Sequence, residues 1–140
     1  MLLWSRVLGL SVTGVLAVCQ RAVGATVDST ILILARDAYS ASSASLGFEG
    51  YGIPYETVIV PKEGVTLPSL TAAEDQGRYG GIVVMGAVSY DYGGAWRSAL
   101  TDAQWTSIHQ YQTNFSVRMT RIDEFPGPAY GECLLHTPAS

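Results

Sequence analysis

The segment 84–98, with the sequence VMGAVSYDYGGAWRS, sets two tyrosines, an aspartate and a tryptophan among glycines, directly after an apolar run. Aromatic rings beside a carboxylate can fill a local core. They can also stack on the apolar face of a sugar ring while the carboxylate accepts hydrogen bonds from its hydroxyl or amino groups. Gly86, Gly93 and Gly94 would let the backbone approach a ligand closely. The position of this segment in the fold decides between the two roles.

Residues that could perform catalysis are sparse. A hydrolase or amidotransferase built on a parallel sheet needs a serine or cysteine on a sharp turn after a strand. Ser89 follows an apolar run but lacks the flanking glycine pattern, and its candidate base, His109, falls in a helical segment where a surface role is the alternative. His109 and His136 have no metal-ligand spacing, and phosphate-binding motifs are absent. The sequence therefore predicts no catalytic residue, metal site or cofactor within these 140 residues, with a small serine hydrolase or amidotransferase-like enzyme as the alternative.

The elements that would position segment 84–98 follow from the hydrophobic pattern. Strands are predicted at 29–37, 55–61, 80–86 and 117–123. The first and third of these are continuously apolar, which is typical of a parallel sheet covered on both faces. Between the second and third strands, the pattern predicts a loop with one helical turn.

Two helices are predicted between these strands. The segment 40–52 has Ala41, Ala44, Phe48 and Tyr51 at helical spacing, but its glycines limit it to a short helix. A stronger helix begins at Thr101, which forms a capping box with Gln104. Its inward side would consist of Trp105, Ile108, Tyr111 and Phe115. The resulting order predicts an α/β fold: a flavodoxin-like (amidotransferase-like) parallel sheet of about four strands with flanking helices. We expect this domain to be incomplete.

In open parallel sheets, ligands bind beyond the carboxyl ends of the strands. Three segments are expected to meet there: 35–40, 87–96 and 123–130. The ligand-binding residues predicted from them are Arg36, Asp37, Tyr39, Tyr90, Asp91, Tyr92, Trp96 and Asp123, with Glu124 beside the last. The alternative is that Trp96 and one tyrosine cover the end of the sheet and that Asp37 caps a helix.

The N-terminus has the layout of a secretory signal peptide: a basic start at Arg6, an apolar run of about 13 residues and small residues before position 26. We expect residues 1–25 to be cleaved and 26–140 to form the α/β domain, secreted to the outside of the cell or the cell wall, with no membrane attachment after cleavage. Asn114 begins an N-glycosylation sequon. Cys133 would then lack a partner in an oxidising compartment, which suggests a domain truncated at its C-terminus, or a buried free thiol.

The net charge of the chain limits the classes of binding partner. Cleavage would remove two arginines and no acidic residue, so the net charge of −4 would become about −6. No basic patch is visible in the sequence, so nucleic acid is not an expected partner. An acidic surface suits neutral or cationic polymers.

The run from Ser29 to Pro128 resembles the N-terminal region of fungal secreted polysaccharide deacetylases of the galactosaminogalactan type, through GYGIPYE, YGGIVVMG and SYDYGG. The resemblance implies a carbohydrate-binding accessory domain of an enzyme that modifies a biofilm exopolysaccharide. The family's catalytic aspartate and metal-binding histidines have no match, so the metal-dependent deacetylase domain is expected downstream. The expected partners are an amino-sugar polysaccharide and that catalytic domain. A domain that only packs against its neighbour is the remaining alternative.

Overall fold

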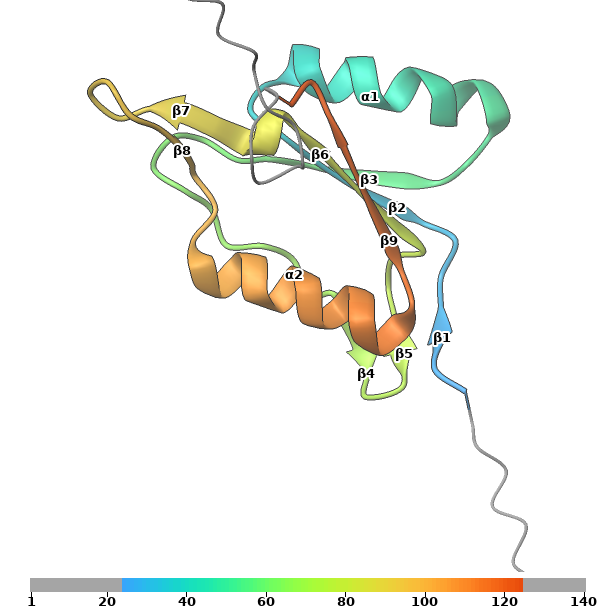
Figure 1. The fold of residues 1–140 in the computed structure, drawn as a ribbon. Helices are drawn as coiled ribbons and strands as arrows, with labels where there is room; N and C mark the ends of the chain where they lie inside the picture. Colours follow the sequence, from blue (N-terminus) through green and yellow to red (C-terminus); the bar gives the residue numbers. More distant parts are fainter. Residues whose placement is uncertain (1–23, 125–140) are drawn as a thin grey trace, which may run out of the picture.

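A computed structural model describes residues 24–124 (Figure 1). The signal peptide, Cys133 and the end of the third predicted turn lie outside the described residues, apart from Gly24 and Ala25. Among the described residues, no helix has the length and apolar character that a bilayer crossing requires.

The centre of the fold is a four-stranded parallel sheet in the order β3-β2-β6-β9. Its strands are β2 (Ile31–Ala35), β3 (Tyr55–Ile59), β6 (Gly81–Met85) and β9 (Arg118–Ile122). In register, Ile31 pairs with Tyr55 on one side and with Gly81 on the other, and Gly81 pairs with Arg118. All four predicted strands and their parallel direction are confirmed.

Helix α1 (Ala38–Tyr51) covers one face of this sheet (Figure 1). It has 14 residues and confirms the helix that the sequence predicts within 40–52, with its start two residues earlier. Its N-cap is Asp37, whose carboxylate accepts a hydrogen bond from the Ser40 amide at 2.8 Å. Tyr51 lies in this helix at the spacing noted in the sequence, but it is 84% exposed and does not share the packed face of Ala41. Ten residues at about 100° each turn Tyr51 about 80° away from the buried Ala41.

Helix α2 (Asp102–Phe115) covers the opposite face of the sheet (Figure 1). The predicted capping box is present: the Gln104 amide donates to Thr101 Oγ1 at 3.2 Å, and the Thr101 amide donates to Gln104 Oε1 at 2.9 Å. Ile108 and Tyr111 are buried on its inward side. Two hydrophobic cores result, because alternate residues of β2 and β6 point to opposite faces.

The connection from β3 to β6 corrects the prediction of a helical turn. Residues 71–77 instead form β4 (Thr71–Ala73) and β5 (Gln76–Gly77), which join β1 (Thr26–Val27) in a small sheet of order β1-β5-β4. Pro61 and Pro68 disfavour a helix in this connection. The end of the connection is held by α2, because the Tyr111 hydroxyl hydrogen-bonds to the backbone of Tyr79.

Candidate functional site

Segment 84–98 comprises the last two residues of β6, a short turn and a hairpin. After β6, the 3-10 turn η1 (Gly86–Val88) has three successive residues at positive φ, of 54°, 48° and 50°. Strands β7 (Ser89–Asp91) and β8 (Trp96–Ser98) then pair in antiparallel fashion. Gly93 and Gly94 have φ angles of 87° and 91°, and positive φ at both central residues suits a two-residue hairpin turn. The glycines therefore shape a tight turn, and the aromatic residues lie on an ordered ribbon.

Tyr90 is a structural residue of this hairpin. Its hydroxyl donates toward the Val60 carbonyl oxygen at 2.9 Å and the Arg36 carbonyl oxygen at 3.2 Å. Burial is the main reason why the pKa of Tyr90 is raised. The ring thereby ties the hairpin to the ends of β2 and β3.

Two cationic side chains lie over the ring of Tyr92. Its ring centroid is 5.1 Å from Lys62 Nζ and 4.9 Å from Arg97 Cζ. Its hydroxyl donates to the Lys62 carbonyl oxygen at 2.6 Å. With Arg97 and Trp105, it lines a shallow depression of about 670 Å³ that Trp96 does not line.

Trp96 presents its ring to solvent, with 68% of its surface exposed. It lines a cavity of about 500 Å³ at the carboxyl end of the sheet, which we call the switch-point cavity. The residues that line this cavity are Arg36, Gly86, Ser89, Trp96, Asp123 and Glu124.

The strand order explains why a cavity forms at this point. From β2, the chain moves to β3 on one side of the sheet, and it later returns to β6 on the other side. The segments that leave β2 and β6 therefore diverge, and such a topological switch point is where α/β sheets bind ligands. Arg36 directly follows β2, and Gly86 directly follows β6.

The cavity walls combine one guanidinium group, two carboxylates and one aromatic ring. Arg36 Nη1 donates to the Ser89 carbonyl oxygen at 3.2 Å, which holds the guanidinium beside the hairpin. Glu124 Oε1 lies 3.8 Å from Arg121 Nη1. A Cβ atom at Gly86 would lie 3.3 Å from the Asp123 carbonyl oxygen, so glycine allows these two turns to approach closely.

Ser98 anchors the hairpin below Trp96. Its hydroxyl donates to the Ala87 carbonyl oxygen at 2.7 Å. It also accepts hydrogen bonds from Trp105 Nε1 and the Leu100 amide, both at 3.2 Å. One hydroxyl thus connects η1, β8 and α2.

The predicted site residues separate into two groups. Arg36, Trp96 and Asp123 line the switch-point cavity. The other five predicted residues do not line it. They are Tyr90 and Tyr92, whose contacts are given above, and Asp37, Tyr39 and Asp91.

Each of these three residues lies elsewhere. Asp37 caps α1, and the hydrogen bond from the Ser40 amide is the main reason why the pKa of Asp37 is lowered. Asp91 Oδ1 accepts a hydrogen bond from the Gly94 amide at 2.6 Å within the hairpin turn. Tyr39 lies in the first turn of α1 and is 84% exposed. Ser89 and Glu124 also line the switch-point cavity. Glu124 lies two residues after β9, beside Asp123 as the sequence predicts. Ser89, which begins β7 after η1, was considered only as a nucleophile.

The geometry gives no support to a serine hydrolase. His109 packs beside Trp105 on α2, with ring centroids 6.0 Å apart. No hydrogen bond joins it to Ser89 in the part of the chain that the structure describes. Within residues 24–124, no three His, Cys, Asp or Glu side chains lie close enough together to hold a metal ion.

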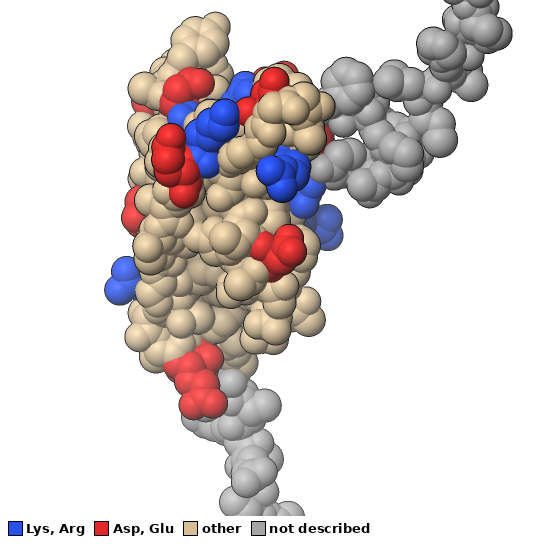
Figure 2. Space-filling model, turned by 90° about the vertical axis from the view of Figure 1, so that its left-hand side faces the viewer, with Lys and Arg blue, Asp and Glu red and all other residues tan. Residues whose placement is uncertain are grey.

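Charged side chains of both signs gather around this end of the molecule. Figure 2 looks at the side on which the hairpin lies, and acidic and basic groups intermix in its upper part. Most of the surface below them is uncharged in this view.

Comparisons with known proteins identify the family. A profile described as Agd3 CBM87 matches residues 27–138. A solved structure described as "Crystal structure of Agd3 a novel carbohydrate deacetylase" matches with a TM-score of 0.72 at 50% identity. The match covers 75% of this chain and 16% of that chain, so this chain spans only a small part of the deacetylase. No curated protein matches. The chain belongs to the Agd3 CBM87 family of carbohydrate-binding modules.

Proposed function

We propose that this chain binds an amino-sugar polysaccharide through the switch-point cavity, as the accessory domain of a carbohydrate deacetylase. The observation that carries the proposal is the exposed Trp96 ring at a cavity that also contains Arg36, Asp123 and Glu124. An indole ring can stack on the apolar face of a pyranose. The guanidinium can donate hydrogen bonds to sugar hydroxyl or carbonyl oxygens, and the carboxylates can accept them from hydroxyl or ammonium groups.

The carboxylates favour the deacetylated form of the sugar. Removal of an N-acetyl group turns a neutral amide into an amine, which carries a positive charge when protonated. Asp123 and Glu124 would attract such a group, although Arg121 partly neutralises Glu124 and the Arg36 guanidinium in the same cavity opposes the attraction. The net negative charge of the chain acts in the same direction at longer range.

The wider context of this function is part of the proposal. We infer that the protein is secreted after cleavage near residue 25, carries an N-glycan on Asn114, and acts in the cell wall or an extracellular matrix. The metal-dependent catalytic domain would follow in the sequence of the parent enzyme. The strand order β3-β2-β6-β9 corresponds to second-first-third-fourth along the chain, which supports a flavodoxin-like arrangement for the domain.

Binding of partly deacetylated galactosaminogalactan to Trp96→Ala tests the proposal. Loss of one stacking ring should cost about 1 kcal/mol or more, which weakens binding about fivefold. Tyr51→Ala is the matched control, because it removes a ring that is also highly exposed but lies at the C-terminal end of α1. Equal affinities of the Trp96→Ala variant and the unsubstituted protein would contradict the proposed site. A protein that binds no polysaccharide would instead support a packing role alone.

A further inference from the structure

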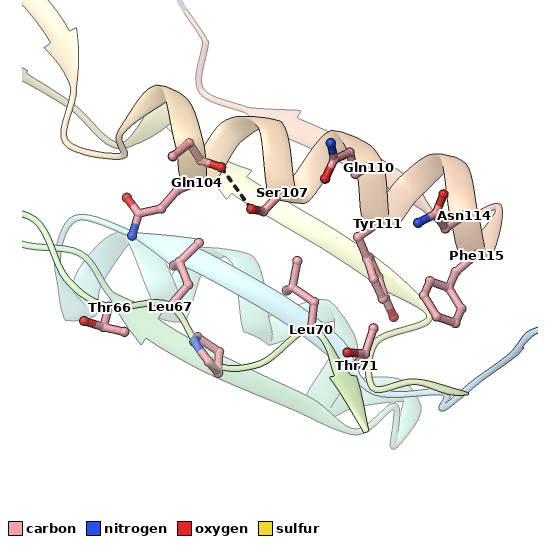
Figure 3. Close-up of a pocket in the computed structure, with 12 residues that line it drawn as sticks. Thr66, Leu67, Leu70, Thr71, Gln104, Ser107, Gln110, Tyr111, Asn114 and Phe115 are labelled. Atoms are coloured by element: carbon pink, nitrogen blue, oxygen red, sulfur yellow. Dashed lines mark hydrogen bonds between the residues drawn. The ribbon is translucent and has the colours of Figure 1, made fainter. Parts of the chain in front are cut away.

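A second hollow lies between α2 and the segment 66–71, and we call it the α2 groove (Figure 3). Its volume is about 470 Å³, within the range of small-molecule sites. It shares no lining residue with the switch-point cavity, and none of its own lining residues is charged. The two hollows therefore offer a ligand different chemistry.

The inner surface of the α2 groove is apolar. Leu67 and Leu70 of the loop point toward α2, while the rings of Tyr111 and Phe115 point from α2 toward the loop (Figure 3). The two ring centroids lie 4.8 Å apart with a tilt of 33°. Leu67, Leu70 and Phe115 are half-buried, so they still present some apolar surface to the groove.

Neutral polar groups surround this apolar surface. The side chains of Thr66, Thr71, Gln110 and Asn114 line the groove, and none of them forms a hydrogen bond with another described residue. Gln104 differs, because its Nε2 donates to the Val65 carbonyl oxygen at 2.7 Å and links the helix to the loop. Two hydroxyls and the Gln110 carboxamide thus remain available for a ligand, together with the Asn114 carboxamide when that residue carries no glycan.

We infer that the α2 groove binds uncharged, N-acetylated units of an amino-sugar polymer, whereas the switch-point cavity takes the cationic units. This inference rests on the proposed function and adds a second site to it. An ammonium group in the α2 groove would lose water without gaining a counter-ion, which is costly. An N-acetyl group offers a methyl to the apolar surface and a neutral amide to Gln110, and to Asn114 in protein that carries no glycan on this residue.

Asn114 requires a defined background for the test, because a glycan on this residue would lie at the wall of the groove. Ser116→Gly removes the sequon through a residue that does not line the groove. Ser116 ends α2 with a φ of 54°, a conformation that glycine adopts readily. The full chain carrying Ser116→Gly is therefore the parent protein for the experiment.

The experiment measures dissociation constants for two matched probes: a fully N-acetylated galactosamine oligosaccharide and the same oligosaccharide after complete deacetylation. The groove variant is Gln110→Ala with Asn114→Ala. Its control is Gln112→Ala, which removes the same type of side chain from the same helix outside the groove. We expect the groove variant to bind the acetylated probe at least about fivefold more weakly and the deacetylated probe unchanged. Trp96→Ala should show the opposite pattern.

The outcomes separate the two sites. Unchanged binding of the acetylated probe to the groove variant would overturn the inference, as would an equal loss for both probes. If Trp96→Ala affects neither probe while the groove variant loses the acetylated one, the proposed cavity fails and the α2 groove stands. If the groove variant does not fold, the side-chain amide NMR signals of Gln110 and Asn114 in the parent protein decide. They should shift with the acetylated probe, and constant signals would overturn the inference.

Discussion

The hydroxyl of Tyr111 on α2 satisfies both backbone polar groups of Tyr79. It donates to the Tyr79 carbonyl oxygen at 2.7 Å and accepts from the Tyr79 amide at 2.9 Å. Both residues are buried. The contact joins residues 32 positions apart and fixes the chain directly before β6.

Tyr111→Phe should lower the free energy of unfolding by about 2 kcal/mol, because a buried amide and a buried carbonyl both lose their partner. The ring would remain in contact with Phe115. Tyr51→Phe is the control, since the Tyr51 side chain is exposed, and it should change stability by less than about 0.5 kcal/mol. Urea unfolding measures both. A Tyr111→Phe protein as stable as its parent would show that the two hydrogen bonds contribute no net stability.

Gly77→Ala should destabilise the protein by about 1–3 kcal/mol. A Cβ atom at this position would overlap the Tyr111 hydroxyl and lie 2.9 Å from Val27 Cγ1. Gly47→Ala is the opposite case, because its Cβ atom would meet nothing within 4 Å and it lies inside α1. That substitution should raise stability by about 0.5–1 kcal/mol. Thermal unfolding measures both variants. Melting temperatures that change in the same direction in both, or in the opposite directions to those expected, would contradict this account.

Acid should weaken the N-terminus of α1 through Asp37. The hydrogen bond from the Ser40 amide lowers the pKa of this carboxyl below its ordinary value of 3.8. A lowered pKa in the folded state means that the stabilisation is present above the unfolded pKa and is lost as the pH falls through the folded one. Asp37→Asn keeps an N-cap acceptor but cannot titrate.

Melting temperatures of the parent and Asp37→Asn, measured from about pH 6 to about pH 2.5, test this expectation. This range covers the pH at which a carboxyl with a lowered pKa titrates. Below about pH 4, the melting temperature of the parent should fall relative to that of Asp37→Asn. A difference that does not vary with pH would show that protonation of Asp37 has no effect on stability.

Ser116→Gly should remove the glycan from Asn114 without loss of stability. Secretion from a eukaryotic host should yield a parent protein whose electrophoretic mobility changes on treatment with a peptide N-glycosidase, whereas the variant should not respond. Because Ser116 has a φ of 54°, glycine should also raise the melting temperature of the unglycosylated protein. Thr113→Gly, in the last turn of the same helix, should lower it. A parent protein unaffected by the glycosidase would refute the glycosylation.

The sequence predicts the central sheet well because its signals are local. The continuous apolar runs in β2 and β6 indicate burial on both faces, and the Thr101–Gln104 capping box marks the start of α2. The small sheet was missed because β1 and β5 have only two residues each and are stabilised by pairing across the chain. No local sequence pattern predicts such pairing.

The candidate site could be predicted only in part for a related reason. The rule for parallel sheets brings Arg36, Trp96 and Asp123 to one end of the sheet. It cannot tell that the Tyr90 hydroxyl meets a carbonyl 30 residues away, since that depends on side-chain packing. Aromatic residues on the two strands of one hairpin look equivalent in the sequence, although Trp96 faces solvent and the Tyr90 hydroxyl bonds to the backbone.

The three hydrogen bonds of Ser98 have a consequence for affinity. Because they hold the base of β8 to η1 and α2, the backbone that carries Trp96 has already lost most of its conformational freedom when the protein folds. A sugar that stacks on the indole then needs to immobilise little more than the side chain itself, so the entropic penalty of association is small. Rigidity two residues away from the ring thus strengthens recognition without any direct contact to the ligand.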